Sequence, residues 1–445
     1  MENYRENVIE NAPYTPILKR ITAFACTGQL IDGYILTMIG IALLQAVPAL
    51  KMDSYWTGLC GAAALVGILF GGLIFGYLTD RFGRRFIYRA SISSLLLLSV
   101  AQMFVQDGMQ LVICRFLLGL AIGADYSIAA AIIAEFTPKR YRGTFGGATI
   151  AGWYIGALLA SAVGYYLLIS GEDTWRWMLG SSAVLAAIAL MGRLTTPESP
   201  RWLLNKGRKE EARQVIKLVW GQQADIEDVE EEATVKTNLS KLFQGEYLKR
   251  VFFVGTFWVA QVTPCFALYT FGPQILTALG MSEGNMWIWG YAVLSIFFFI
   301  GCLPALRWVD TVGRRPLIIW SFVFMTIPLL ILGVVPHAPA AVIVACFALY
   351  AFASGGPNVL DGVYPIELFP TDVRATAYGV VIGISRIGAA VGTFLIPVSL
   401  ETFGAGNTML TAAAISGVGL AVCILMAPET KGKSLHETSS VGAKN

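Results

Sequence analysis

Residues 76–85 read Gly-Tyr-Leu-Thr-Asp-Arg-Phe-Gly-Arg-Arg, a short basic turn between two long apolar runs of the chain. The turn is repeated at residues 308–315, which read Trp-Val-Asp-Thr-Val-Gly-Arg-Arg. Its acid, its glycine and its two arginines return at the same offset of 230 positions. A repeat of this length, made of apolar segments, is typical of a secondary transporter built from two duplicated halves.

Two further pairs of motifs support the duplication. Glu135 and Arg142 correspond to Glu367 and Arg374 in the second half. The Pro-Glu-Ser at 197–199 likewise corresponds to a Pro-Glu-Thr at 428–430. Each of these motifs follows a long apolar run, so we predict that each pair occupies equivalent places in the two halves.

The composition indicates a membrane protein. Of the 445 residues, 56% are hydrophobic and 14% are charged, whereas about a quarter of the residues in a soluble domain are charged. The net charge of +3 is too small to indicate a nucleic-acid partner. The seven cysteines are scattered without metal-ligand spacing, and no nucleophile–base pair is recognisable. We therefore predict no metal, no cofactor and no catalytic residue, and we expect the surrounding partner to be the lipid bilayer.

Apolar runs of about 20 residues, the length that crosses about 30 Å of hydrocarbon, occur twelve times. We predict an all-α membrane protein with twelve transmembrane helices in two six-helix bundles. The predicted spans are 21–46, 55–78, 86–105, 109–136, 144–169, 176–196, 251–278, 287–308, 316–334, 339–365, 375–400 and 408–427. The predicted divisions are an N-terminal segment 1–20, a first bundle 21–196, a linker 197–250 with short amphipathic helices, a second bundle 251–427 and a tail 428–445.

Lys and Arg gather in the segments on one side of these spans, including the two basic turns, the linker and both ends of the chain. Because cytoplasmic loops carry an excess of Lys and Arg, both termini are expected to be cytoplasmic. The first 20 residues lack the basic-then-apolar form of a signal peptide, so the first apolar run should stay in the membrane. We expect a multi-pass protein of the bacterial inner membrane, present as a monomer.

Four motifs taken together carry a family resemblance. They are the Asp-Arg-x-Gly-Arg-Arg turn at 80–85, Pro-Glu-Ser-Pro-Arg-Trp-Leu at 197–203, Glu-Leu-Phe-Pro-Thr-x-x-Arg at 367–374 and Pro-Glu-Thr-Lys-Gly at 428–432. In this order they closely resemble the sugar-porter side of the major facilitator superfamily, over nearly the whole chain. The resemblance implies the major facilitator fold, one central substrate cavity and alternating access, often driven by a proton gradient.

The charged motif residues are predicted to form a conformational switch, since a carboxylate can accept from a helix N-terminus and from nearby arginines and so hold one conformation closed. The alternative is that the basic residues only fix the topology. The predicted switch residues are Asp80, Arg84, Arg85, Glu135, Arg142, Glu198, Arg201, Asp310, Arg314, Arg315, Glu367 and Arg374.

Two charges within the first half lie at matched depth. Asp32 lies about 17 Å and Arg115 about 20 Å from the same edge of the membrane, at 1.5 Å per residue. An isolated charge at that depth costs several kcal/mol, so the two side chains are predicted to be partners. In the functional interpretation, protonation of Asp32 releases Arg115. The alternative is a static ion pair that only packs the bundle.

Arg386 lies at a similar depth in the second half, and its planar guanidinium suits a carboxylate of the substrate. The equally open alternatives are pairing with backbone carbonyls, with Asp361 or with Asp125, although structural pairing is favoured for Asp125. Gly355-Gly356-Pro357-Asn358 and Thr263-Pro264 are predicted to interrupt their helices beside a cavity. The predicted substrate-binding residues are Arg386, Gln261, Asn358, Trp153, Tyr154 and Tyr269.

The chain departs from the sugar carriers at three of these points. The acid of the first helix precedes Gly33-Tyr34 as Asp32, the seventh helix keeps only Gln261, and the eleventh carries Arg386. These changes look like the relatives that carry aromatic acids, nicotinate and other organic ions. We therefore expect proton-coupled uptake of a small polar metabolite such as a nicotinate-like carboxylate or a sugar acid. The alternatives are a neutral sugar:proton symporter, a multidrug/proton antiporter and a non-transporting membrane receptor.

Overall fold

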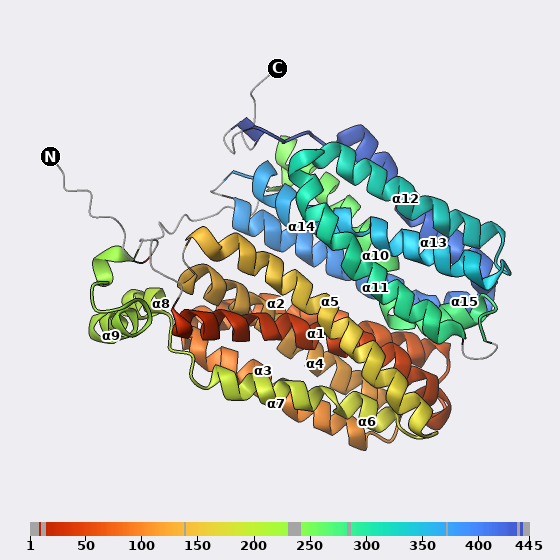
Figure 1. Ribbon diagram of the computed structural model, residues 1–445, viewed down its shortest axis with the longest axis horizontal. Coiled ribbons are helices and arrows are strands. Elements are labelled where there is room, and N and C mark those ends of the chain that lie inside the picture. The colour runs from red at the N-terminus through yellow and green to blue at the C-terminus, as the bar shows by residue number, and fades with distance from the viewer. Residues whose placement is uncertain are drawn as a thin grey trace.

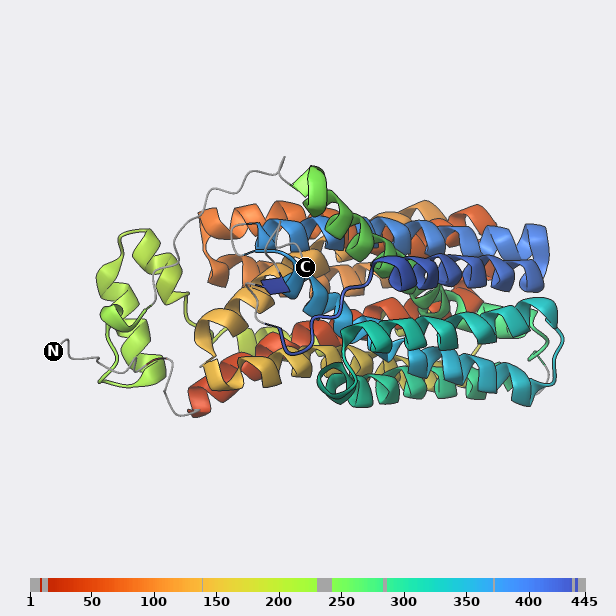
Figure 2. The ribbon, with the colours of Figure 1, turned by 90° about the horizontal axis from the view of Figure 1, so that it is seen from above.

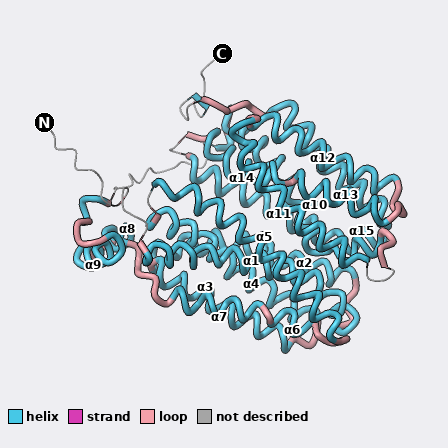
Figure 3. The backbone as a smooth tube through the Cα atoms, viewed as in Figure 1, coloured by secondary structure: helices cyan, strands magenta, loops and turns pink. Residues whose placement is uncertain are grey.

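The computed structural model of the protein describes residue 9 and residues 15–137, 139–229, 242–282, 286–370, 373–433 and 437–438. Within these ranges the side chains of residues 80, 134, 139–148 and 375 are left undescribed. Two of the predicted switch residues, Asp80 and Arg142, therefore lie outside the described side chains. Throughout the described part the regular structure consists of helices alone (Figure 3).

The first half consists of five long helices followed by one helix in two pieces. Their bounds are α1 Pro16–Ala49, α2 Ser54–Phe82, α3 Arg84–Ala101, η1 Gln102–Phe104, α4 Gly108–Phe136, α5 Lys139–Ser170, α6 Trp175–Gly180 and α7 Ser182–Arg193. Asp53 and Asp107 cap α2 and α4 by accepting a backbone N–H of the first turn, which fixes where the chain re-enters the bilayer. Because α6 and α7 together form one apolar span, this half crosses the membrane six times.

The second half repeats the arrangement. Its helices are α10 Gly245–Ala278, α11 Met286–Thr311, α12 Arg314–Val334, α13 Ala340–Ala353, α14 Gly355–Leu368 and α15 Arg374–Met426. At 53 residues, α15 would extend about 80 Å, far beyond about 30 Å of hydrocarbon. Gly404, with a φ of 77°, breaks it, and the chain folds back to give two crossings side by side (Figure 2). Eleven spans are long and apolar enough in the described part, so this fold-back confirms the predicted twelve crossings.

Two crossings of the second half are broken. The tenth is divided between α13 and α14 at Ser354, beside the predicted Gly-Gly-Pro-Asn. The seventh crossing, α10, was predicted to break at Thr263-Pro264, and this prediction was wrong. Pro264 lies inside the helix, and the non-helical residue is Phe271, with φ of −119° and ψ of 18°.

A second proline explains the position of the break in α10. Pro273 has no N–H to donate to the carbonyl oxygen of Tyr269, four residues earlier. The hydroxyl of Tyr291 in α11 donates to that carbonyl instead, at 2.7 Å. A donor from the neighbouring helix therefore satisfies the backbone where α10 opens, as a break at membrane depth requires.

The linker forms a small helical unit at one end of the molecule (Figure 1). It contains α8 Pro200–Asn205, α9 Lys209–Trp220 and η2 Ile226–Asp228. Helix α9 is amphipathic and buries Ala212, Ile216, Val219 and Trp220. The ring of Trp220 stacks on Phe136 at the end of α4, with centroids 5.6 Å apart. In the described part, the linker therefore packs on the first half of the protein.

The two halves lie side by side and meet along three pairs of helices (Figures 1 and 2). These pairs are α1 with α10, α2 with α15, and α5 with α11. A Cβ atom on Gly40 of α1 would overlap the carbonyl oxygen of Thr270 in α10, so only glycine allows this approach. Gln274 of α10 donates to the carbonyl of Gly40 at 3.0 Å. The halves are thus in backbone contact toward the end remote from the linker.

The repeated basic turn has the same geometry in both halves. Gly83 joins α2 to α3 with a φ of 98°, and Gly313 joins α11 to α12 with a φ of 107°. A Cβ atom on Gly83 would lie 2.6 Å from a carboxylate oxygen of Glu198. The equivalent atom on Gly313 would lie 2.7 Å from Glu429. Both glycines therefore combine a conformation that side chains rarely adopt with a carboxylate too close to leave room for a Cβ atom.

We expect Gly83→Ala to destabilise the protein by about 1–3 kcal/mol, because alanine at this φ is strained and its methyl group displaces Glu198. The matched control is Gly76→Ala in the same motif, since Gly76 is helical and no described side chain lies within 4 Å of its Cβ position. Thermal unfolding of the purified variants in detergent measures the difference. Equal melting temperatures for the two variants would contradict the role given to this turn.

Candidate functional site

The buried acid of the first half lies where three helices meet. Asp32 of α1 is 1% exposed, and one of its oxygens accepts from the indole N–H of Trp153 in α5 at 2.7 Å. The same oxygen accepts a short hydrogen bond from the hydroxyl of Tyr126 in α4. A Cβ atom on Gly33 would overlap the backbone of Trp153, so the glycine beside Asp32 brings α5 this close. The other oxygen, Oδ1, has no hydrogen-bond partner among the described residues.

Arg115 of α4 is also 1% exposed, but its partner differs from the predicted one. It donates to the carbonyl oxygen of Ile35 at 3.2 Å. The sequence predicted a direct pair between Arg115 and Asp32. In this structure Trp153 and Tyr126 are instead the residues that donate hydrogen bonds to Asp32. Ile35 lies one helical turn beyond Asp32, so Arg115 and Asp32 lie at a similar level along α1 but do not make the predicted direct contact in the described part. Nε and Nη2 of Arg115 remain without a hydrogen-bond partner in the described part.

Uncharged residues predicted to bind substrate form one cluster across the two halves. Asn358 of α14 donates to the hydroxyl of Tyr154 in α5 at 2.9 Å. Gln261 of α10 donates to the amide oxygen of Asn358 at 3.0 Å. The ring of Tyr269 meets the ring of Trp153 edge to face at 4.8 Å. The structure thus brings all five of these residues together, and it places them beside Asp32 through Trp153.

Arg386 of α15 reaches toward the same region from the second half. Its guanidinium lies 5.4 Å from the ring of Phe266 and 6.0 Å from the ring of Tyr126. These are cation–π distances. Nε of Arg386 is buried without a hydrogen-bond partner in the described part of the chain. Tyr126, which the sequence analysis did not single out, therefore stands between the acid of one half and the arginine of the other.

The first half also contains a buried ion pair between Arg193 and Asp125. Arg193, at the end of α7, binds Asp125 of α4 through both terminal nitrogens, one of them at 3.0 Å. Ser91 donates to the same carboxylate at 3.1 Å, and the guanidinium lies 4.0 Å over the ring of Tyr88. Sequence analysis missed Arg193 because it ends an apolar run, where an arginine usually marks the membrane edge. The structural interpretation of Asp125 agrees with these contacts.

The charged motif residues form a network within each half. In the first half, Glu198 accepts from the backbone N–H groups of Arg84 and Arg85, at 2.9 and 3.1 Å, at the start of α3. The side chain of Arg84 pairs with Glu135 at 2.7 Å. A carboxylate at a helix N-terminus is favourable because the first N–H groups of a helix have no partner within it. Arg201 lines a small cavity beside Glu135.

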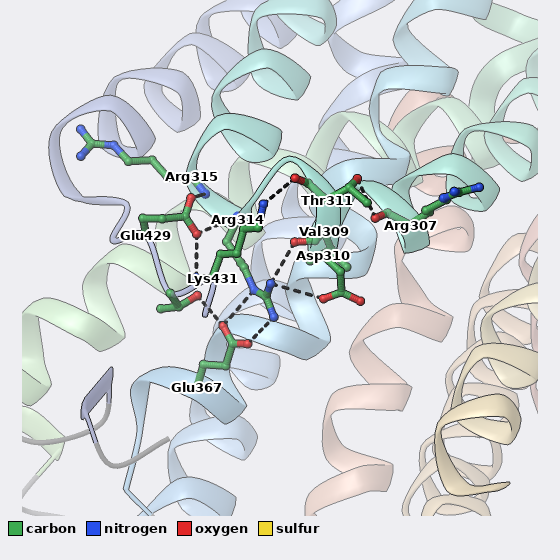
Figure 4. Close-up of polar contacts among 10 residues, drawn as sticks. Arg307, Val309, Asp310, Thr311, Arg314, Arg315, Glu367, Glu429 and Lys431 are labelled. Atoms are coloured by element: carbon green, nitrogen blue, oxygen red, sulfur yellow. Dashed lines mark hydrogen bonds and ion pairs between the residues drawn. The ribbon is translucent and has the colours of Figure 1, made fainter. Parts of the chain in front are cut away.

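The second half repeats this network contact for contact (Figure 4). Glu429 accepts from the backbone N–H groups of Arg314 and Arg315, both at 3.1 Å, and the side chain of Arg314 pairs with Glu367 at 2.8 Å. Burial acts to raise the pKa of Glu429, but backbone N–H donors, including those of Lys431, hold it below its ordinary value. This carboxylate therefore stays ionised as it caps α12.

Two predicted switch residues of the second half have weaker contacts. The side chain of Asp310 is 75% exposed and lies 3.3 Å from Arg314 (Figure 4). An exposed pair of this kind contributes little to stability. Arg374 donates to the carbonyl of Phe369 at 3.0 Å, which ties the start of α15 to the end of α14.

Comparison with known proteins gives a consistent result. The family model described as "Sugar (and other) transporter" matches residues 21–441. YaaU of Escherichia coli (strain K12), which carries the name of a metabolite transport protein, is 44% identical over 97% of this chain and 97% of its own. The inner membrane metabolite transport protein YgcS of the same strain is 33% identical over 98% of this chain and 97% of its own.

Among solved structures, the fold is similar to that of the xylose transporter XylE from E. coli in a partially occluded inward open conformation. The TM-score is 0.78, and the match covers 93% of this chain and 99% of that chain. At 22% sequence identity this likeness supports the twelve-helix fold and says nothing of the substrate.

The buried Asp125–Arg193 pair and the exposed Asp310–Arg314 pair should differ in how much their loss destabilises the protein. Asp125→Asn leaves the buried guanidinium of Arg193 without a counter-charge, and we expect it to destabilise the protein by about 3–5 kcal/mol. Asp310→Asn removes an exposed pair and should change stability by less than about 1 kcal/mol. Thermal unfolding in detergent compares the variants. A stable Asp125→Asn protein would show that the Asp125–Arg193 pair does not hold α7 to α4.

Proposed function

The chain belongs to the sugar (and other) transporter family of the major facilitator superfamily, and from this premise we propose that it is a proton-coupled symporter for a small metabolite bearing a carboxylate. It is a multi-pass integral membrane protein whose relatives are transporters. The name of YgcS supports placement in the bacterial inner membrane. The basic side of the spans would then face the cytoplasm, with both termini on that side.

One observation carries the proposal. A buried acid of the first half and an arginine of the second half meet at the same aromatic ring, and each has a polar atom without a hydrogen-bond partner among the described residues. The acid is Asp32, the arginine is Arg386 and the ring is Tyr126. A charge in the membrane interior is costly and so marks a functional site, with an acid typical of proton relays and an arginine suited to a carboxylate.

In the proposed mechanism, Asp32 carries the proton. A carboxylate accepts strong hydrogen bonds, and a protonated acid accepts weaker ones, so protonation loosens the hold of Asp32 on Tyr126 and Trp153. Those two residues belong to α4 and α5, and Tyr126 also lies against Arg386. Loading the proton therefore changes the surroundings of the arginine that is proposed to bind substrate. Proton and substrate would be coupled through this ring.

The charged turns are proposed to act as the conformational switch. Each turn joins two helices to a carboxylate that comes from beyond the last helix of the same half, Glu198 or Glu429. These contacts make each half a unit that can rock against the other. The interface of α1 with α10 and of α2 with α15 is then the part that opens and closes during alternating access.

A neutral sugar:proton symporter is the second candidate. The cluster of Asn358, Gln261 and Tyr154 is uncharged, and its amide and hydroxyl groups suit the hydroxyl groups of a sugar. The two candidates differ in what Arg386 does, because only a carboxylate needs its charge. Uptake of nicotinate, glucuronate and glucose into liposomes containing the purified protein tells them apart.

We expect Asp32→Asn to uncouple transport, because asparagine resembles the protonated acid. In liposomes, counterflow exchange of the transported probe should persist, whereas uphill uptake driven by a proton gradient should be lost. Asp173→Asn, which replaces an exposed acid between α5 and α6, is the control and should keep uphill uptake. Undiminished uphill uptake by Asp32→Asn would show that Asp32 does not carry the coupled proton.

Arg386→Lys should weaken binding of a carboxylate probe about tenfold or more, since lysine keeps the charge but loses the planar fork, a difference of about 1.4 kcal/mol or above. Binding of glucose, if it is the transported probe, should be far less affected. Equilibrium binding to the purified variant measures both. Unchanged affinity for every carboxylate probe would leave Arg386 without a substrate role.

A further inference from the structure

A second acid lies buried in the interior of the second half. Asp361 of α14 is 8% exposed. Its Oδ1 is buried without a hydrogen-bond partner, and no ion pair or hydrogen bond to this side chain is found in the described part of the chain. It follows Asn358 by three residues, so both side chains are presented by one face of α14. Asn358 contacts the first half through Tyr154, which places Asp361 one turn from that contact.

The titratable groups around Asp361 come from four helices. They are Cys265 of α10, Cys302 of α11, Tyr154 of α5, and Tyr378 and Arg386 of α15. Arg386 is the one charged side chain among its described electrostatic partners. Helix α14 is held closely against α11, because a Cβ atom on Gly355 would overlap the backbone of Gly301. The acid is thus fixed on the inner side of the second half and has one cation in reach.

Asp361 and Arg386 are opposite charges on neighbouring helices that do not form an ion pair here. Nε of Arg386 and Oδ1 of Asp361 both lack hydrogen-bond partners in the described part. An ionised carboxylate left without a partner at membrane depth costs several kcal/mol, and a protonated one does not carry this cost. The arrangement is therefore that of a neutral acid beside an available guanidinium.

We propose that Asp361 is protonated in this conformation and that, once ionised, it competes with the carboxylate of the substrate for Arg386. This inference rests on the proposed function and names the residue that frees Arg386 for the substrate. With Asp361 protonated, Arg386 is free to bind the substrate carboxylate. When Asp361 releases its proton, its own carboxylate binds Arg386 and the substrate carboxylate leaves. One proton and one carboxylate thus load together and leave together, and the charge beside Arg386 is the same in both states.

Asp32 and Asp361 then act on different halves. The hydrogen-bond donors to Asp32 are Tyr126 and Trp153, both in the first half. The charged side chain that interacts electrostatically with Asp361 is Arg386, in the second half. Protonation of Asp32 alters how α4 and α5 are held, and protonation of Asp361 decides whether Arg386 is occupied. Arg386 can therefore be neutralised either by the ionised Asp361 or by the carboxylate of the substrate.

Infrared spectroscopy of the full-length protein in lipid nanodiscs, without any substrate, tests the protonation directly. We expect a carboxylic-acid absorption at neutral pH that Asp361→Asn removes. Asp361→Glu should keep an absorption of this class at a shifted frequency, which covers the case in which the asparagine variant does not fold. A folded Asp361→Asn protein whose carboxylic-acid absorption equals that of the wild type would overturn the proposal, as would Asp361→Glu without such an absorption if the asparagine variant fails to fold.

The competition for Arg386 is tested by raising the pH in the same experiment. In Arg386→Gln the ionised form of Asp361 loses its counter-charge, so its acid absorption should persist to a pH higher by about one unit or more. Arg386→Lys keeps the charge and should stay close to the wild type. An absorption that disappears at the same pH in Arg386→Gln and wild type would rule out the competition. Because this assay uses neither substrate nor gradient, its outcome is independent of uphill uptake in liposomes, which tests the proposed function.

Discussion

The cost of an unpaired charge in hydrocarbon is the constraint on which this structure depends. At the end of the molecule where the linker lies, charged residues are common. Glu198 and Glu429 cap α3 and α12, and the arginines at these helix starts pair with further glutamates. Within the membrane, Asp125 binds both terminal nitrogens of Arg193 and holds α7 to α4, while Nε of Arg193 has no hydrogen-bond partner in the described part. Four other interior charges make no ion pair among the described residues, and each also keeps a buried atom without a hydrogen-bond partner there: Asp32, Arg115, Asp361 and Arg386. Charges that stay without an ion pair at this depth are costly, which favours a functional role for these four residues.

Because the chain is duplicated, the two halves contain similar networks of charged residues. Glu198 and Glu429 make the same pair of backbone contacts in the two halves, and Gly83 and Gly313 share the same unusual backbone conformation. The networks that stabilise each half are therefore internal to it. Between the halves the contacts are of another kind, made of close backbone approaches and single hydrogen bonds such as that from Asn358 to Tyr154. Contacts of this kind can be exchanged at small cost, which suits a rocking motion.

Much of the fold could be predicted from the sequence, because hydrophobic length and a repeated motif are one-dimensional signals. Depth is such a signal too, and it placed Asp32 and Arg115 at the right level. The direction in which a side chain points around its helix is not, so the predicted contact between them was wrong and Tyr126 was missed. Arg193 was missed for a related reason, since a position at the end of an apolar run does not show that the side chain turns inward. The break in α10 depends on a hydroxyl of α11 that local sequence cannot reveal.

The central claim is that protons and substrate move together through the interface between Asp32 and Arg386. Liposomes that contain the purified protein and an internal pH-sensitive dye test it most directly, with nicotinate, glucuronate and glucose added outside one at a time and no gradient imposed. The account predicts that the transported carboxylate acidifies the interior of the liposomes as it enters. It also predicts that the substrate no longer accumulates inside when a protonophore is present. Entry of a substrate without any accompanying proton movement would contradict it.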